Sequence, residues 1–259
     1  MGITIHSSQQ DFAGMRIAGN LAARTLDYIA PYVKCGITTD ELNTLCHDYI
    51  VSNKGTCAPL GYLGYPKSIC TSVNNVVCHG IPGAYKLQNG DIINIDVTTI
   101  VNGWHGDTSR MFIIGDVSRE ILRLVDVCYN AMMLGIEQVK PGNRLGNIGH
   151  AIQSYVESNK FSVVQDYCGH GIGRIFHDDP QVLHYGKANT GLILQEGMFF
   201  TIEPMINAGR HHTVLDPGDG WTVTTRDKSL SAQFEHTLAV TASGYEIFTL
   251  SPAKLDKPY

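Results

Sequence analysis

Two stretches of this chain repeat one another, and this repeat limits the folds open to it more than any other feature. The segment KCGITTDELNTLCHDYIVSNK, beginning at Lys34, aligns without a gap with KPGNRLGNIGHAIQSYVESNK, beginning at Lys140. Farther along, LQNGDIINID ends at Asp96 and LQEGMFFTIE ends at Glu203. Because the blocks occur in the same order, we interpret the chain as an internal duplication rather than as a chance likeness of two helix-plus-strand segments. Three further residues of the first half match the second half at one constant offset in sequence. Cys70, His79 and Pro82 correspond to Cys168, His177 and Pro180.

Local signals predict two helices followed by strands in the first half. A capping box at Ser8 opens a helix to about Ala30, and a second one at Thr38 opens a helix that ends near Gly55. A strand-rich stretch follows at about 68–114.

The same order is predicted again in the second half. Ser118 caps a helix to about Val139, Pro141-Gly142 breaks the chain, and a helix covers about 145–159 before further strands. We therefore expect an α/β fold in one domain, residues 1–259, with repeats of about 8–114 and 118–250 whose antiparallel strands meet at a pseudo-twofold centre.

A set of acidic and imidazole side chains interrupts the apolar, strand-like runs. An ionised side chain is costly to bury without a cationic partner, and taken singly each of these residues is more often a satisfied polar group than a ligand. Together they indicate bound divalent ions, and a carboxylate-rich set suits Mn, Co, Fe or Zn. Asn102-Gly103 reads as a hairpin turn that would place the first two members on one face. The set is Asp96, Asp107, His170, Glu203 and Glu235.

Composition excludes several classes of protein. A hydrophobic content of 43% supports a sizeable core, and a net charge of -5 without a Lys or Arg run argues against nucleic-acid binding. Neither a signal peptide nor an apolar span is found, so a cytoplasmic protein without a membrane partner is expected. A monomer is expected as well, although no sequence feature specifies the oligomeric state. The 7 cysteines contain no C-x-x-C pair, which argues against disulfides and sulfur-ligated zinc.

The motifs VCHGIP, DVTTIVNGWHGDTSRMF, CGHGIG, FTIEPM and QFEHTLAVT follow one another along the chain. In this order they resemble the type I methionine aminopeptidases of the bacterial kind, and the likeness covers practically the whole chain. The resemblance implies the pita-bread α/β fold, in which duplicated halves surround a central dinuclear metal site. It also implies removal of the initiator Met from nascent polypeptides with a small second residue, and it suggests the ribosome as a further partner.

The resemblance also assigns roles within the candidate metal site. Asp96 would chelate one ion, Asp107 and Glu235 would bridge both, and His170 with Glu203 would complete the other. Two cations that share a water lower its pKa, so that hydroxide would be available to attack the Met carbonyl carbon. The identity of the native ion, Co, Mn, Fe or Zn, stays open.

Further residues are assigned to the substrate by the same resemblance. His79 would face the scissile amide nitrogen, His177 would face the carbonyl oxygen, and Glu203 would also carry a proton to the leaving amine. A monovalent-cation site is implied at Asn74, Val76 and Ser231. Aromatic and sulfur-containing side chains suit an unbranched thioether, and the implied pocket consists of Tyr62, Tyr65, Cys70, Phe176 and Trp221.

Four alternative classes of protein compete with this assignment. Proline-specific relatives have an additional N-terminal domain, and the type II methionine enzymes have a helical insertion for which the span from Glu203 to Glu235 has no room. A non-catalytic binding module on the same scaffold would be expected to lose ligands and gain basic surface. An iron oxygenase with two His and one carboxylate would bind one metal ion and depend on O₂.

Overall fold

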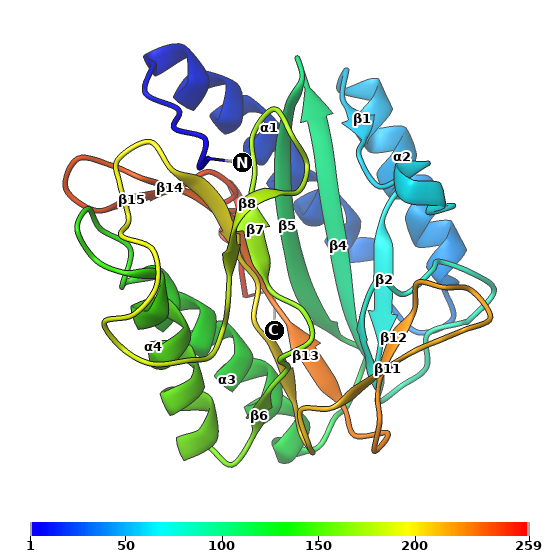
Figure 1. The fold of residues 1–259 in the computed structure, drawn as a ribbon. Coiled ribbons are helices and arrows are strands. Elements are labelled where there is room, and N and C mark those ends of the chain that lie inside the picture. Colours follow the sequence, from blue (N-terminus) through cyan, green and yellow to red (C-terminus); the bar gives the residue numbers. More distant parts are fainter. Residues whose placement is uncertain (1, 258–259) are drawn as a thin grey trace.

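A strongly curved antiparallel sheet forms the centre of the computed structural model, which describes residues 2–257 (Figure 1). The large sheet has nine strands in the order β1-β4-β5-β14-β9-β7-β8, with β2 paired to β4 and β15 paired to β14. The mixed α/β class predicted from the sequence is confirmed. Residue 1 and residues 258–259 of the expected 1–259 domain lie outside the described part.

The helices begin where the sequence predicted. Helix α1 (Gln9–Ile29) and helix α2 (Thr39–Ser52) start at complete capping boxes, at Ser8 and Thr38. Helix α3 (Arg119–Ile136) starts at Ser118 and α4 (Leu145–Ser158) follows it. Helix α3 ends before the expected Val139 because the next turn is of the tighter 3₁₀ type. In this turn the Gln138 N–H donates to the Gly135 carbonyl, and the Val139 N–H donates to the Ile136 carbonyl. Two short 3₁₀ turns are η1 (Ala30–Tyr32) and η2 (Tyr62–Gly64).

The strands of the first half are dominated by one long hairpin. Its arms, β4 and β5, pair along their whole length, and both lie on the apolar face of α1. The strands of this half are β1 (Thr56–Cys57), β2 (Cys70–Val73), β3 (Val76–Cys78), β4 (Ile92–Val101) and β5 (Trp104–Ile113).

The strands of the second half are shorter. Most have three to six residues, and they are divided between the large sheet and the small sheets β13-β10-β6 and β11-β12-β3. Those in the large sheet are β7 (Gly169–Gly171), β8 (Asp178–Val182), β9 (Phe199–Ile202), β14 (Glu235–Val240) and β15 (Tyr245–Ile247). The others are β6 (Ser162–Val163), β10 (Met205–Asn207), β11 (Thr213–Leu215), β12 (Val223–Thr225) and β13 (Ser231–Gln233).

Each helix pair covers its own part of the sheet with its own core. Side chains of α1 and α2 pack with the first-half strands around Leu26, Ile50 and Ile95, and those of α3 and α4 pack with the second-half strands around Cys128 and Phe200. Figure 1 shows α1 behind the β4–β5 hairpin, α2 to its right, and α3 and α4 at the lower left. The division into repeats of about 8–114 and 118–250 stays a prediction, and the order of helices and strands is consistent with it. None of the helices within residues 2–257 has the length and apolarity that a bilayer crossing requires.

Candidate metal centre

The long hairpin places two of the predicted ligands on one face. Residues Asn102 (φ 51°) and Gly103 (φ 78°) are both left-handed, as a two-residue type I′ turn requires, so the predicted turn is confirmed. Asp96 lies opposite Ser109 and Asp107 lies opposite Thr98 in the resulting register. Because side chains alternate along a strand, both carboxylates point to the same side of the hairpin.

Three neighbouring strands of the second half bring the remaining candidates to that face. Strand β14 pairs with β5 and places Glu235 opposite Ser109, while β9 and then β7 follow in the sheet. His170 lies in the middle of β7, and Glu203 comes directly after β9. The glycines on either side of His170 permit this packing, because a Cβ at Gly169 or Gly171 would collide with a backbone carbonyl.

The candidate side chains meet in one cluster. Ligand atoms of Asp107, His170 and Glu235 lie within 4.8 Å of one another. The Nε2 atom of His170 is 3.6 Å from Asp107 Oδ2 and 3.7 Å from Glu203 Oε1. Asp96 completes the group, and its Oδ1 atom is buried with no hydrogen-bond partner in the described residues. The sheet thus gathers all the predicted ligands.

The electrostatics of the cluster require positive charge. Burial raises the pKa of Asp96 and of Glu235 well above the usual range, and the neighbouring Asp107 raises both further. Burial also raises the pKa of Glu203 to about 7. For His170, burial opposes the charged form, but Asp107 and Glu203 outweigh it and raise the pKa of the imidazole. Carboxylates that repel one another in a buried site are stabilised by divalent cations, so this donor set fits metal ions.

Thiols lie near the cluster but contribute none of the ligand atoms that meet in it. Burial raises the pKa of Cys70 and of Cys78 well above that of a free thiol, and it raises the pKa of Cys168 as well. Among the described residues, the atoms that meet are carboxylate oxygens and an imidazole nitrogen, which suit ions that accept oxygen and imidazole ligands.

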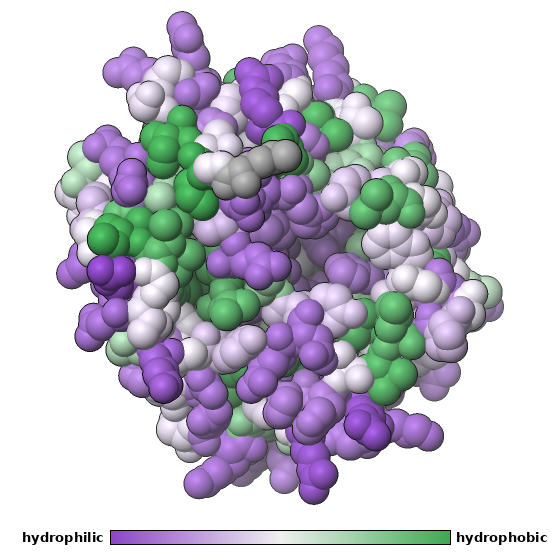
Figure 2. Space-filling view, in the orientation of Figure 1, coloured by the Kyte–Doolittle hydropathy of each residue, from purple (hydrophilic) through white to green (hydrophobic). Residues whose placement is uncertain are grey.

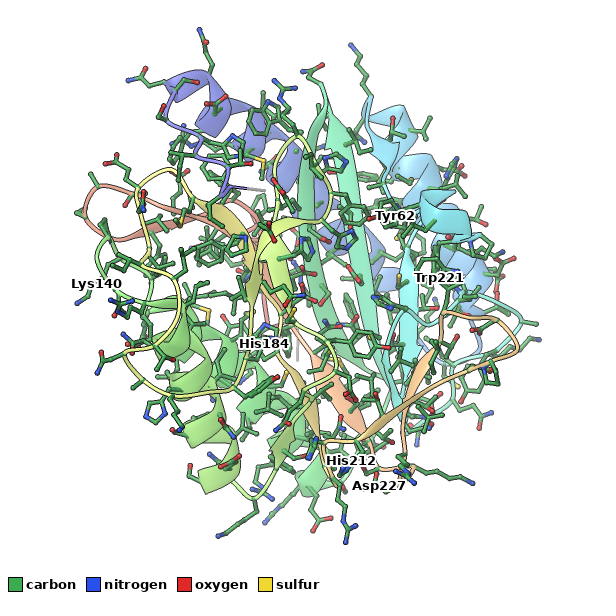
Figure 3. All side chains as sticks on the ribbon, viewed as in Figure 1. Tyr62, Lys140, His184, His212, Trp221 and Asp227 are labelled. Atoms are coloured by element: carbon green, nitrogen blue, oxygen red, sulfur yellow. The ribbon has the colours of Figure 1, made fainter. Side chains whose placement is uncertain are left out.

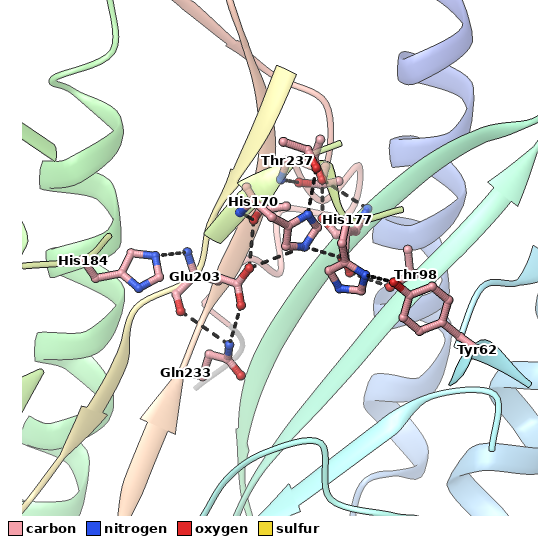
Figure 4. A network of polar contacts seen from close by, with 12 residues as sticks. Tyr62, Thr98, His170, His177, His184, Glu203, Gln233 and Thr237 are labelled. Carbon is pink, nitrogen blue, oxygen red and sulfur yellow. Dashed lines mark hydrogen bonds and ion pairs between the residues drawn. The ribbon is translucent and has the colours of Figure 1, made fainter. Parts of the chain in front are cut away.

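Hydrogen bonds that the sequence analysis did not predict hold the candidate ligands in place (Figure 4). The Thr98 hydroxyl donates to Asp107 Oδ1 at 2.7 Å. The Thr201 hydroxyl accepts the backbone N–H of His170 at 3.0 Å and donates to Glu203 Oε1 at 2.8 Å. Gln233 donates to Glu203 Oε2 at 3.3 Å. Each of these partners is two positions from a candidate ligand, so the two-residue periodicity of extended chain was the signal that could have identified them.

His184 is a further partner, from outside the cavity. It is fully buried, and its Nε2 atom accepts the backbone N–H of Glu203 at 3.0 Å. Burial lowers the pKa of His184 to about 3, so the ring is neutral with its proton on Nδ1, which has no partner in the described residues. A histidine within the otherwise apolar run QVLHY was the available sequence signal, the same kind that identified His170.

The cluster forms the floor of a cavity of about 590 Å³. Figure 2 shows its mouth as a hollow near the middle of the molecule, and in Figure 3 Tyr62 and Trp221 lie to the right of the sheet centre, with His184 to the left. Cys78, Tyr167 and Met205 also line the cavity and were not predicted. All the predicted substrate-facing residues line it, namely Tyr62, Tyr65, Cys70, His79, Phe176, His177 and Trp221.

The two predicted substrate-facing histidines have different surroundings. The Nδ1 atom of His177 lies 2.9 Å from the Tyr62 hydroxyl. Although His177 is exposed as a residue, its ring lies among the rings of Tyr62, Phe176 and His170, and desolvation there lowers its pKa. His79 has a left-handed backbone (φ 56°) and lies between Tyr167 and Trp221, where burial lowers its pKa.

The residues of the implied monovalent-cation site are near one another. The backbone N–H of Ser231 donates to the Asn74 carbonyl at 2.9 Å, and Val76 begins β3 two residues later. The Ser231 hydroxyl is buried without a hydrogen-bond partner in the described residues.

Comparison with known proteins gives a consistent result. The model of metallopeptidase family M24 matches residues 13–242. The chain is 63% identical over 258 residues to the methionine aminopeptidase of Rickettsia prowazekii, covering 100% of this chain and 99% of that one. It is 54% identical over 252 residues to the enzyme of Escherichia coli K12, covering 96% and 95%.

Solved structures agree with these matches. The crystal structure of the Rickettsia prowazekii enzyme superposes with a TM-score of 0.95 over 96% of this chain and 100% of that one. The methionine aminopeptidase of Thermotoga maritima, at 38% identity, gives 0.93 over 96% and 99%. The prolidase of Pyrococcus horikoshii, at 18% identity, gives 0.74 over 95% of this chain and 63% of its own, a likeness of fold alone. The predicted pita-bread fold is confirmed, and the chain belongs to metallopeptidase family M24 and, within it, to the methionine aminopeptidases.

Proposed function

We propose that this enzyme removes the N-terminal Met from polypeptides whose second residue is small. The observation that carries the proposal is a single cavity whose floor is a carboxylate-rich ligand cluster and whose walls are aromatic and sulfur-containing side chains. Such walls suit the polarisable Met side chain. We propose that the substrates are nascent chains leaving the ribosome in the cytoplasm, and that one monomer, as a single catalytic domain, is sufficient.

Two divalent ions are proposed to bind the cluster. Asp96 would chelate one ion, Asp107 and Glu235 would bridge the pair, and His170 with Glu203 would hold the second. When bound, these ions supply a hydroxide nucleophile near neutral pH and polarise the Met carbonyl group. Any of Co, Mn, Fe and Zn is compatible with the donor set.

Side chains of the cavity would bind the carbonyl oxygen, orient the scissile amide and transfer the proton. His177, held by the Tyr62 hydroxyl through Nδ1, would donate from Nε2 to the carbonyl oxygen as negative charge develops there. His79 would orient the scissile amide nitrogen. Glu203 would carry a proton to the leaving amine, because its carboxylate lies in the same cluster as the proposed ions and within the cavity that the substrate would enter.

The Met side chain is proposed to enter between Tyr65, Cys70 and Trp221, with Tyr62 and Phe176 at the mouth. The Tyr65 hydroxyl donates within the protein to carbonyl groups of Ile69 and Gly80, so it leaves an apolar ring for the substrate. For the monovalent cation, we propose Asn74, Val76 and Ser231 as ligands, which would satisfy the Ser231 hydroxyl.

Peptide hydrolysis tests the proposal. Metal-depleted protein should release no Met from Met-Ala-Ser, and activity should return when Mn, Co, Fe or Zn is restored separately. Met-Ala-Ser should be cleaved at least about 100-fold better in kcat/KM than Met-Lys-Ser, because a long second side chain clashes with the cavity walls. A peptide that begins Ala-Pro is the control for the proline-specific alternative. Equal cleavage of the small and large second residues, or cleavage of the Ala-Pro peptide alone, would contradict the proposal.

A further inference from the structure

A second cavity lies beside the first, along strand β8. Its volume is about 470 Å³, and its rim contains Asp179, Gln181 and Thr190. Most of its wall is apolar and comes from the N-terminal segment, the start of α4 and the chain after β8. The apolar side chains are Ile3, Leu145, Pro180, Leu183, Tyr185 and Leu192. We call this cavity the β8 groove.

Apolar surface stays open to solvent at the groove. Leu183, in the wall of the groove, is 39% exposed. Figure 2 shows apolar surface to the left of the central hollow. Contiguous exposed apolar side chains with a polar rim are typical of binding surfaces.

The β8 groove shares part of its wall with the catalytic cavity. Asp179 and Gln181 line both cavities, so the chain between them is a shared wall. Gln181 lies opposite His170 across the β7–β8 ladder. Since neighbouring strands are about 4.8 Å apart, the groove begins roughly one strand spacing from a proposed metal ligand.

The position of β8 also leaves a path between the two cavities. Among the described residues β8 is the edge strand of the large sheet and pairs only with β7. No further strand therefore separates the mouth of the catalytic cavity from the groove. Next to the groove, the Thr4 hydroxyl donates to Asp178 Oδ2 at 2.9 Å, which joins the N-terminal segment to the start of β8.

We propose that the β8 groove binds the part of the substrate that follows its second residue and favours apolar side chains there. The inference rests on the proposed function, because a peptide whose Met fills the catalytic cavity must leave it with its later residues at the mouth. An extended chain advances about 3.3 Å per residue, so residues only a few positions after the Met reach the shared wall. The occupant is thus the substrate polypeptide itself, and the enzyme reads more than the first two residues.

Three peptides separate this inference from the proposed function. They are Met-Ala-Ser, Met-Ala-Ser-Leu-Leu-Ser and Met-Ala-Ser-Gly-Gly-Ser, tested with metal-loaded enzyme. The leucine hexapeptide should exceed the glycine hexapeptide by about tenfold in kcat/KM, mostly through KM, as expected from partial burial of one leucine side chain. Leu183→Ser should remove most of this preference and leave the kcat/KM of Met-Ala-Ser within about twofold of the parent, because surface substitutions rarely disturb folding.

A matched variant controls for a general loss of apolar surface. Leu250 is 48% exposed and lies outside both cavities, so Leu250→Ser should keep the full leucine preference. A second groove variant, Leu192→Ala, should reduce the preference independently of Leu183.

The possible outcomes are distinct. If Met-Ala-Ser is cleaved and the hexapeptides do not differ, or if Leu183→Ser keeps the preference, the groove inference is overturned and the proposed function stands. If Met-Ala-Ser is not cleaved, both fail. Self-association that Leu183→Ser abolishes, without any effect on hexapeptide cleavage, would instead assign the groove to a second copy of this chain and overturn the inference.

Discussion

The two halves of the molecule hold their candidate metal ligands in different ways. In the first half, Asp96 and Asp107 lie within long paired strands, so the backbone ladder fixes both. In the second half, His170 lies in a strand of three residues and Glu203 follows the end of another. There His170 and Glu203 depend on hydrogen bonds to side chains, so matched positions in the two sequence blocks need not share their support.

The contrast is greatest between Asp96 and Glu203, which end the matched sequence blocks. Strand β4 continues through Asp96 to Val101, whereas β9 stops at Ile202. Glu203 precedes Pro204, where the chain passes from the large sheet into β10 of a small one. At this point the Glu203 N–H leaves the ladder and finds His184 instead.

The largest expected effect tests whether the halves share the metal ions. Asp107→Asn changes the first half and Glu235→Gln the second, and both residues are proposed to bridge. Each variant should lose metal and roughly 10³-fold or more in kcat/KM, since metal ions contribute several kcal/mol to such reactions. Metal content and Met-Ala-Ser hydrolysis measure this. A variant that keeps both ions would refute shared ligation.

The matched histidines give the next largest effect. His177→Ala should lower kcat by about 10²–10³ without loss of metal, because it removes a donor to developing charge. Tyr62→Phe keeps the aromatic wall and removes only the hydroxyl at His177 Nδ1, so kcat should fall while KM for Met-Ala-Ser changes little. His79→Ala should cost less than His177→Ala. Loss of metal from either alanine variant would make that histidine a ligand, and an unchanged kcat would make it structural.

A pair of threonines tests the support of the ligands directly. Thr201 joins His170 to Glu203 in the second half, whereas Thr98 bonds only the side chain of Asp107, whose backbone the hairpin already fixes. Thr201→Val should weaken metal binding by about 10- to 100-fold, the usual range for groups that orient a ligand. Thr98→Val should weaken it by less than about tenfold. Calorimetric titration with the metal ion measures both affinities. Equal losses of affinity in the two variants would show that the two halves do not differ in how they support their ligands.

The sequence predicted most of the scaffold because its signals are local. Capping boxes at Ser8 and Thr38 and the Asn102-Gly103 turn each need only a few neighbouring residues, and all three formed as expected. Grouping the candidate ligands was also within reach, because buried charges in apolar runs must have partners.

The support of the ligands was harder to predict. The bond from Glu203 to His184 and the link from Thr201 to His170 depend on which strands become neighbours. The β8 groove likewise joins Ile3, α4 and the chain after β8, segments that only the fold brings together. A single sequence carries little information about such distant contacts.

The smallest expected effect concerns pH, and it separates Asp96 from Glu203 in metal-free protein. A buried carboxyl whose folded-state pKa is raised contributes stability that is fully present below its unfolded pKa, near 4, and is lost as the pH rises through the folded pKa. Burial raises the pKa of Glu203 to about 7, so its contribution to stability is lost once the pH is somewhat above 7. For Asp96, whose pKa burial raises well above the usual range, the loss continues at higher pH.

Replacing a carboxyl by an amide, as in Glu203→Gln and Asp96→Asn, removes the titrating group and keeps the shape of the side chain. At a pH where the carboxyl of the parent protein is ionised, the variant should therefore be more stable than the parent. In the presence of a chelator, the Tm of Glu203→Gln should exceed the parent Tm by on the order of 5 °C at pH 8, and the two should converge near pH 5. The gain of Asp96→Asn should still be increasing above pH 8. Comparison at each pH cancels the opposite trend of buried neutral histidines such as His184, which are unchanged in both proteins. Parallel Tm profiles for parent and Glu203→Gln would show that folding does not raise the pKa of Glu203 in metal-free protein, and would contradict this prediction.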